Sequence, residues 1–316
     1  ALMLGRTANS IFWMFRYLER AENTARLLDA GFRMALTRGV DAANEEWRSV
    51  IVTLGLQAAY EKHHAEYGGS QVCNFVLRDR ENPENVMRMV ERARSNARAA
   101  RTSITAEVWE AVNESWMLLD NLLIRPVRET GLGTVLSMIR RSATLVRGAT
   151  YGSMLRNEIY HFARTGTYIE RADNTARILD VKYYLLLPSL AYVGSSLDTG
   201  QWDNVLRSLS AERAYRWLNA GRMDPRGIAE FLILDRRFPR SLSFSYDALE
   251  GNLASLAELH GSQSLCNTLV AQVETRLRTT TIDRIFDAGL HEFLVNFIAD
   301  NQAIASAVSD EYRFIA

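Results

Sequence analysis

The stretch that decides the fold occurs twice, as YLERAENTARLLD at residues 17–29 and as YIERADNTARILD at residues 168–180. Ten of the thirteen positions are identical, and the other three are conservative exchanges, such as Glu22 for Asp173. Apolar residues recur every three or four positions in both copies, which predicts a helix with one apolar face. A repeat of this identity indicates that the chain contains two related helical units.

The similarity continues downstream of these stretches, in the same order. WRSVIVTLGLQAAY, from residue 47, matches WDNVLRSLSAERAY, from residue 202, and NFVLRDRENP, from residue 74, matches EFLILDRRFP, from residue 230. The copies lie 151, 155 and 156 residues apart, which is too long a period for a solenoid. We therefore predict one domain, residues 1–316, formed by two similar halves at about 1–150 and 151–316 and related by a pseudo-twofold axis.

The remaining segments have the pattern of helices rather than of strands. Residues 47–63 and 289–315 place apolar side chains at three- and four-residue spacing, whereas the nearest approach to a strand, TTTI at 279–282, is short. We predict an all-α fold, a compact multi-helix bundle of about nine to twelve helices. Asn82, followed by Pro83, is predicted to cap one of them.

Composition and charge restrict the function. The chain is 47% apolar and 23% charged, and 37 basic residues balance 37 acidic ones, so nucleic acid and anionic membranes are not expected partners. The most apolar stretch, 183–194, is short and is interrupted by Pro188, and no signal peptide is recognisable. Cys73 and Cys266 form no metal-binding or redox pattern, which favours reduced thiols and a cytoplasmic location.

The polar face of the repeated helix is the candidate site. Surface ion pairs contribute little and exchange freely between residue types, yet Arg20 is not replaced by lysine in the second copy. Asn23 is also kept, although asparagine is a mediocre helix former. We therefore predict that this face is buried and fixed by hydrogen bonds. The candidate residues are Glu19, Arg20, Glu22, Asn23, Arg26, Asp29, Glu170, Arg171, Asp173, Asn174, Arg177 and Asp180.

Three interpretations of this face remain open: a buried structural network between the two repeated helices, a ligand or partner site, and a metal-dependent catalytic site. The helices are expected to meet near the pseudo-twofold axis, through small residues or through their polar faces. The small residues are Ala21, Ala25, Ala172 and Ala176. In the network, Glu19 and Glu170 would be satisfied by Arg20, Arg26, Arg171 and Arg177, together with Asn23 and Asn174.

The metal interpretation rests on Glu158-x-x-His161, a fragment of the type that di-iron bundles use. Glu158 and Glu170 are twelve residues apart, about 18 Å along a continuous helix. They could share a metal only if the helix broke, for example at Gly166. The arginines of the repeated stretch would also neutralise its carboxylates, so we expect no metal site.

No other constellation in the sequence points to a reaction or to a cofactor. There is no nucleophile elbow, zinc-protease motif or kinase motif, and GLG at 131–133 lacks the rest of a phosphate loop. Glu107, Glu110 and Glu114 have a helical spacing and could face either the repeated helix or solvent. The arginines within residues 88–101 divide between two sides of a helix, which does not form a nucleic-acid stripe.

The repeated elements resemble the signature of the alpha-E family, an all-α bacterial group named for its glutamate–arginine pair. LGRTANSIFWMFRYLERAEN at 4–23 and ARSNARAARTSITAEVWEAVN at 93–113 are similar to its pattern too, except that Ser95 stands where that pattern has an acidic residue. The resemblance implies a setting beside atypical ATP-grasp amide ligases and transglutaminase-like peptidases, which make or process a peptide or amide-linked product. The positions that it implicates are Glu19, Arg20, Asn23, Arg26, Glu170, Arg171, Asn174 and Arg177.

Two functional hypotheses follow. In the first, the chain is a non-catalytic helical module that binds the ligase or holds its peptide substrate. In the second, it is an enzyme that acts on an amide or carboxylate substrate at the charged glutamate–arginine cluster. The lack of a recognisable nucleophile, base pair or phosphate loop in the sequence favours the first.

Overall fold

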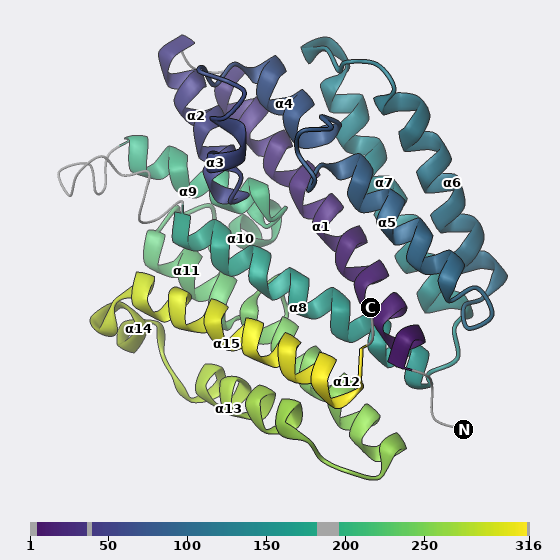
Figure 1. Cartoon of the computed structure of the whole chain (residues 1–316). Helices are drawn as coiled ribbons and strands as arrows, with labels where there is room; N and C mark the ends of the chain where they lie inside the picture. The colour runs from purple at the N-terminus through teal and green to yellow at the C-terminus, as the bar shows by residue number, and fades with distance from the viewer. Residues whose placement is uncertain (1–4, 37–39, 182–195, 315–316) are drawn as a thin grey trace.

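The computed structural model describes residues 5–36, 40–181 and 196–314, and within these ranges every regular element is a helix (Figure 1). The first seven are α1 (Gly5–Leu36), α2 (Val40–Thr53), α3 (Gln57–Tyr60), α4 (Gly69–Leu77), α5 (Val86–Ala99), α6 (Ala106–Leu123) and α7 (Glu129–Ser153). The others are α8 (Glu158–Asp180), α9 (Ser196–Ser208), α10 (Glu212–Leu218), α11 (Pro225–Leu234), α12 (Leu242–His260), α13 (Leu265–Thr279), α14 (Ile282–Ala288) and α15 (Leu290–Glu311).

The all-α fold is confirmed, but the predicted number of helices is too low. Fifteen helices occur in the described ranges, because α3, α10 and α14 have only four to seven residues each. So short a helix spans at most two turns, and its apolar spacing merges with that of its neighbours in a sequence.

The start of α5 differs from the prediction. Its N-cap is Asn85, whose side chain accepts a hydrogen bond from the backbone N–H of Arg88 at 2.8 Å. Asn82 instead donates to the carbonyl oxygen of Phe75 and accepts from the backbone N–H of Glu84, both at 3.0 Å. The residues around Pro83 therefore form a turn before the helix rather than its first turn.

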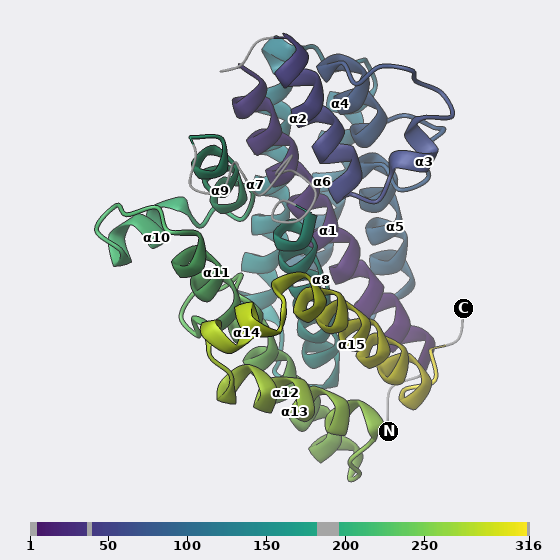
Figure 2. The ribbon, with the colours of Figure 1, turned by 90° about the vertical axis from the view of Figure 1, so that its left-hand side faces the viewer.

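α1 and α8, which carry the two copies of the repeated stretch, lie at the centre of the molecule and form its most extensive helix contact. Figures 1 and 2 show these two signature helices between two groups of helices. α1 packs against α2, α5 and α7, and α8 packs against α12 and α15. In each group a further helix, α6 or α13, covers the outer side. This arrangement agrees with a pseudo-twofold relation, although the duplication itself stays a prediction.

Gly166 allows the signature helices to approach closely. A Cβ atom at this position would lie 2.4 Å from the carbonyl oxygen of Phe12 on α1, a distance that no side chain could tolerate. α8 continues through Gly166 without a break. The break that would bring Glu158 and Glu170 to one metal is therefore absent.

The core contains the paired aromatic residues that the sequence comparison aligned. Trp47, Trp202, Tyr60 and Tyr215 are all at most 4% exposed, as expected for large aromatic side chains at helical spacing. Within the described part of the chain, no helix is long and apolar enough to cross a membrane. The apolar stretch 183–194 lies outside the described residues.

Candidate functional site between the signature helices

In each signature helix, the arginine that directly follows the glutamate binds the glutamate of the other signature helix. Arg171 of α8 donates from Nε and Nη2 to the two carboxylate oxygens of Glu19 at 2.8 and 3.0 Å. Arg20 of α1 donates in the same way to Glu170 at 2.6 and 3.1 Å. Both glutamates are almost fully buried. Such two-pronged pairs combine charge with fixed geometry, so they set how α1 and α8 are oriented relative to one another.

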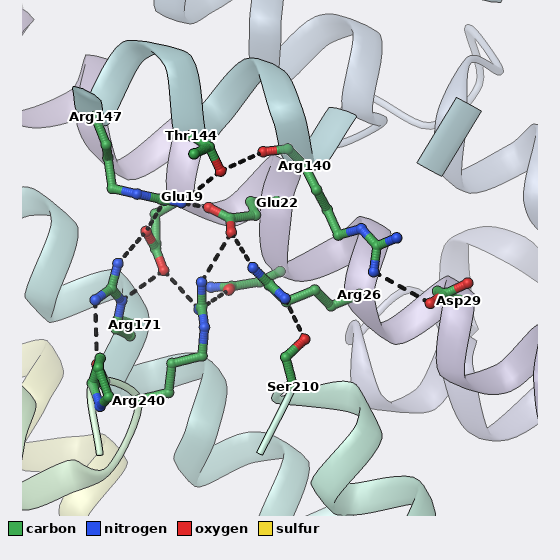
Figure 3. A network of polar contacts seen from close by, with 12 residues as sticks. Glu19, Glu22, Arg26, Asp29, Arg140, Thr144, Arg147, Arg171, Ser210 and Arg240 are labelled. Atoms are coloured by element: carbon green, nitrogen blue, oxygen red, sulfur yellow. Dashed lines mark hydrogen bonds and ion pairs between the residues drawn. The ribbon is translucent and has the colours of Figure 1, made fainter. Parts of the chain in front are cut away.

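On one side of these helices, further arginines fill the space around Glu19 (Figure 3). Arg240, in the turn before α12, donates to Glu19 at 2.9 Å, to Glu22 at 3.0 Å and to the side-chain oxygen of Asn23 at 2.8 Å. Arg147 of α7 donates to Glu19 and to Glu22. We call this set the Glu19 cluster; it consists of Glu19, Glu22, Asn23, Arg26, Arg147, Arg171 and Arg240.

Charge pairing keeps the Glu19 cluster ionised despite its burial. Burial alone would raise the pKa of Glu19, but the positive charges of Arg171 and Arg240 outweigh it and hold that pKa well below its usual range. Burial also lowers the pKa of Arg240 to about 10, against the influence of Glu19. The guanidinium therefore remains charged at neutral pH, and the cluster contains two carboxylates and four guanidinium groups.

The opposite side, around Glu170, is differently built. Glu170 accepts hydrogen bonds from Arg20 and, at 2.9 Å, from Arg16. Burial alone would raise the pKa of Glu170, but the positive charges of these two arginines lower it by a larger amount. The pKa of Glu170 therefore lies below its usual value. The residue that aligns with Arg240 is Glu84, because each follows the proline that ends its matched segment. Glu84 accepts from Arg20 at 3.2 Å and from Arg92 at 2.8 Å.

A cavity of about 300 Å³ lies on this side, in contact with α1, α4, α5, α8 and the end of α2. Asn23 and Asn174, which occupy equivalent positions of the repeated stretch, both line it. The side-chain nitrogen of each is buried and has no hydrogen-bond partner among the described residues. Buried polar groups are normally hydrogen-bonded, so two unpaired donors at one cavity mark it as a candidate binding site.

The structure brings most of the predicted site residues together, but it corrects some of the predicted pairs. Arg26 binds Glu22 at 2.5 Å and also Ser210, and Arg177 binds Asp173 at 2.7 Å. Both arginines thus pair four residues back along their own helix instead of binding Glu19 or Glu170. A spacing of four residues is slightly more than one helical turn, so the acidic and basic side chains are neighbours on the helix surface.

The last aspartate of each copy lies apart from the central pairs. Asp29 pairs with Arg33 and with Arg140 of α7, each at 3.3 Å. Asp180 contacts His291 of α15 at 2.5 Å. These two residues attach the ends of the signature helices to neighbouring elements.

Four residues of the site were missed in the sequence: Arg16, Glu84, Arg147 and Arg240. Arg240 is 221 residues from its partner Glu19 in the chain, and no local pattern predicts such a contact. The one usable signal was the alignment of residues 74–83 with 230–239, whose next positions are Glu84 and Arg240.

The other candidate motifs do not converge on this site. Glu158 contacts Nε2 of His260 at 2.6 Å, and His161 contacts Asn252 at 2.9 Å, so the two residues of the di-iron fragment have separate partners. No three metal-ligand side chains gather anywhere within residues 5–36, 40–181 and 196–314. Glu107, Glu110 and Glu114 are exposed on α6.

The fold and the site together define an all-helical protein whose two central helices exchange glutamate–arginine pairs. The chain belongs to the Alpha-E family, described as a predicted alpha-helical domain with a conserved ER motif, and the family pattern matches residues 3–312. No solved structure matches the chain significantly.

Similar proteins occur in mycobacteria. An uncharacterised protein of Mycobacterium bovis and one of Mycobacterium tuberculosis are each 23% identical to 96% of this chain. The match covers 36% of each relative, so the chain spans about a third of the length of the curated relatives it matches. In these proteins the helical domain is part of a considerably longer polypeptide.

Proposed function

We propose that this chain is a non-catalytic module that holds a substrate in a cytoplasmic peptide- or amide-ligation system, together with an ATP-grasp ligase and a transglutaminase-like peptidase. The observation that supports it is the cavity at the meeting point of the two signature helices, lined by two asparagines whose side-chain nitrogens are buried and unpaired within the described residues. A cavity of this size accommodates a small ligand or the end of a peptide.

The state of the carboxylates argues against acid–base catalysis at the same place. Glu19 and Glu170 are each held by at least two arginines, and the pKa of each lies below its usual value. A general base works best with a pKa near the working pH. Neither glutamate meets this condition, which argues against acid–base catalysis by either of them.

The length of the relatives supports a module that works with other domains. Nearly two thirds of each mycobacterial relative lies outside the match. A domain without chemistry of its own that presents a substrate to neighbouring domains fits such an arrangement.

The experiment combines the purified chain with an atypical ATP-grasp amide ligase of the kind that we propose as its partner. We expect association in size-exclusion chromatography, no ATP consumption by the chain alone, and faster ATP consumption by the ligase when the chain is present. Leu27→Trp should fill the cavity, which Leu27 lines, and abolish this acceleration without preventing association. Leu36→Trp, at an exposed leucine of the same helix, is the matched control. Lack of association, or turnover by the chain alone, would contradict the proposal.

A further inference from the structure

Within the described residues, unpaired hydrogen-bond donors lie at the cavity, whereas the carboxylates of its wall are paired. The carboxylates that line it are already paired: Glu170 with Arg20, Glu84 with Arg20, and Asp173 with Arg177 at 2.7 and 3.3 Å. The amide nitrogens of Asn23 and Asn174, by contrast, have no partner within the described part of the chain. A ligand would therefore satisfy this site by presenting acceptor oxygens.

The orientation of the Asn23 amide follows from the Glu19 cluster. Its oxygen accepts a hydrogen bond from Arg240 at 2.8 Å, and a guanidinium can only donate. The oxygen must therefore face Arg240, and the NH₂ group of Asn23, which lines the cavity, is left buried and without a partner among the described residues. Asn23 is only 2% exposed, so rotation of its side chain to find another partner is restricted. Arg240 of the Glu19 cluster thus fixes the orientation of the Asn23 amide, whose NH₂ group is the donor that we assign to the cavity.

Charge at the cavity suits an anion in spite of the carboxylates nearby. Glu170 is neutralised by Arg16 as well as by Arg20. Arg177 uses Nε and Nη2 for Asp173, and its side chain is 43% exposed, so its outer N–H groups can turn to a ligand. Hydrogen bonds from such donors to an ionised acceptor are stronger than those to a neutral one.

The rest of the lining is aliphatic. Leu27, Leu54, Leu56, Val76 and Met89 all contribute to the cavity wall. Apolar walls with a few placed polar groups are typical of small-ligand sites. The occupant therefore combines an anionic end with a short apolar part.

We propose that the cavity binds a carboxylate attached to an aliphatic group, as at the C-terminus of a peptide that ends in an apolar residue. Asn23 and Asn174 donate to the carboxylate, Arg177 supplies the neighbouring charge, and the leucines contact the aliphatic part. The proposal rests on the proposed function, because it names the class of substrate that the module holds. Among the residues that the structure describes, Arg240 occupies the space beside Glu19 that corresponds to this cavity.

The test is calorimetric titration of the purified chain with three probes: N-acetyl-leucyl-leucine, the same peptide with a C-terminal carboxamide, and free leucine. We expect the carboxamide to bind at least tenfold more weakly than the peptide acid, because it loses charge-assisted hydrogen bonds. Comparison of the peptide acid with free leucine distinguishes a peptide terminus from a single amino acid. Equal binding of acid and carboxamide, or no binding of either acid, would overturn the proposal.

Asn23→Asp and Asn174→Asp give the residue-level test. Each keeps the shape of the side chain but turns the donor into a negatively charged acceptor, so we expect at least tenfold weaker binding of the peptide acid. Asn23→Asp retains an oxygen for Arg240, and its melting temperature should therefore stay close to that of the unaltered chain. Asn121→Asp, at an exposed residue of α6, should bind normally. Unchanged binding in both cavity variants would overturn the assignment.

Association with the ligase, measured on the same variants, separates the two proposals. If the ligase binds but the peptide acid has no advantage over its carboxamide, the carboxylate assignment fails and the module survives. If the peptide acid binds as expected but the ligase does not, the proposed partner is wrong and the ligand class stands.

Discussion

The two sides of the signature helices start from nearly the same residues and end in opposite states. Beside Glu19, Arg240 reaches in and fills the space, and beside Glu170 the equivalent position is Glu84, which turns to Arg20 and Arg92 and leaves a cavity. One side is thus filled by a cluster of ion pairs, and the other side contains a cavity lined by polar and aliphatic side chains. The two sides differ in the sign of the charge at one matched position, which is Arg240 on the filled side and Glu84 on the side of the cavity.

The largest expected effect comes from neutralising one glutamate on each side. Glu19→Gln leaves Glu22 as the only carboxylate among four guanidinium groups, so we expect a loss of about 4 kcal/mol in the free energy of unfolding. Glu170→Gln should cost about half as much, because Arg20 retains Glu84 as a partner. Urea unfolding of both variants measures the difference. Equal losses would mean that the two sides do not differ in energy as they differ in structure.

Acid should weaken the fold through the same carboxylates. The folded-state pKa values of Glu19 and Glu170 lie below the ordinary value of 4.5, so their stabilising contribution is present above about pH 4.5 and is lost as the pH falls toward the folded values. We expect a decrease of about 2 kcal/mol or more in the unfolding free energy over this range, measured by urea titrations at successive pH values.

The control for the acid experiment is Glu114→Gln, at an exposed residue of α6, which should show the same pH dependence as the unaltered chain. Glu19→Gln should show a clearly smaller dependence. A chain whose stability is independent of pH in this range would contradict the pairing of these buried groups.

The smallest expected effect is that of replacing Glu84, which we compare with replacement of Arg240 at the equivalent position. Glu84 is 39% exposed, and ion pairs of exposed groups contribute little, so Glu84→Gln should cost less than about 1 kcal/mol. Arg240→Gln, at a buried position with three acceptors, should cost several times more. Chemical unfolding of the pair provides the measurement, and similar costs would show that Glu84 is part of a structural cluster after all.

The sequence predicted the helical class and the inward direction of the polar face for a physical reason. Apolar spacing is a local signal, and the retention of Arg20 and Asn23 is visible when the two copies are compared; the burial of Glu19 and Glu170 agrees with both. It predicted less well which arginine binds which glutamate. Arg26 and Arg177 lie within reach of acids on their own helices, and this local competition outweighed the longer-range pairing.

Helix formation could be read from the order of residues, because it depends on neighbours within a few turns of chain. The buried glutamate–arginine face could be read from the comparison of the two related stretches. The closed cluster and the open cavity could not, because they depend on Arg147, Arg240 and Glu84. These side chains lie far along the chain from their partners on the signature helices and contact them through the tertiary fold. Electrostatic and packing energies depend on distances in space, and a local sequence pattern does not show which distant charged side chain will contact a given residue.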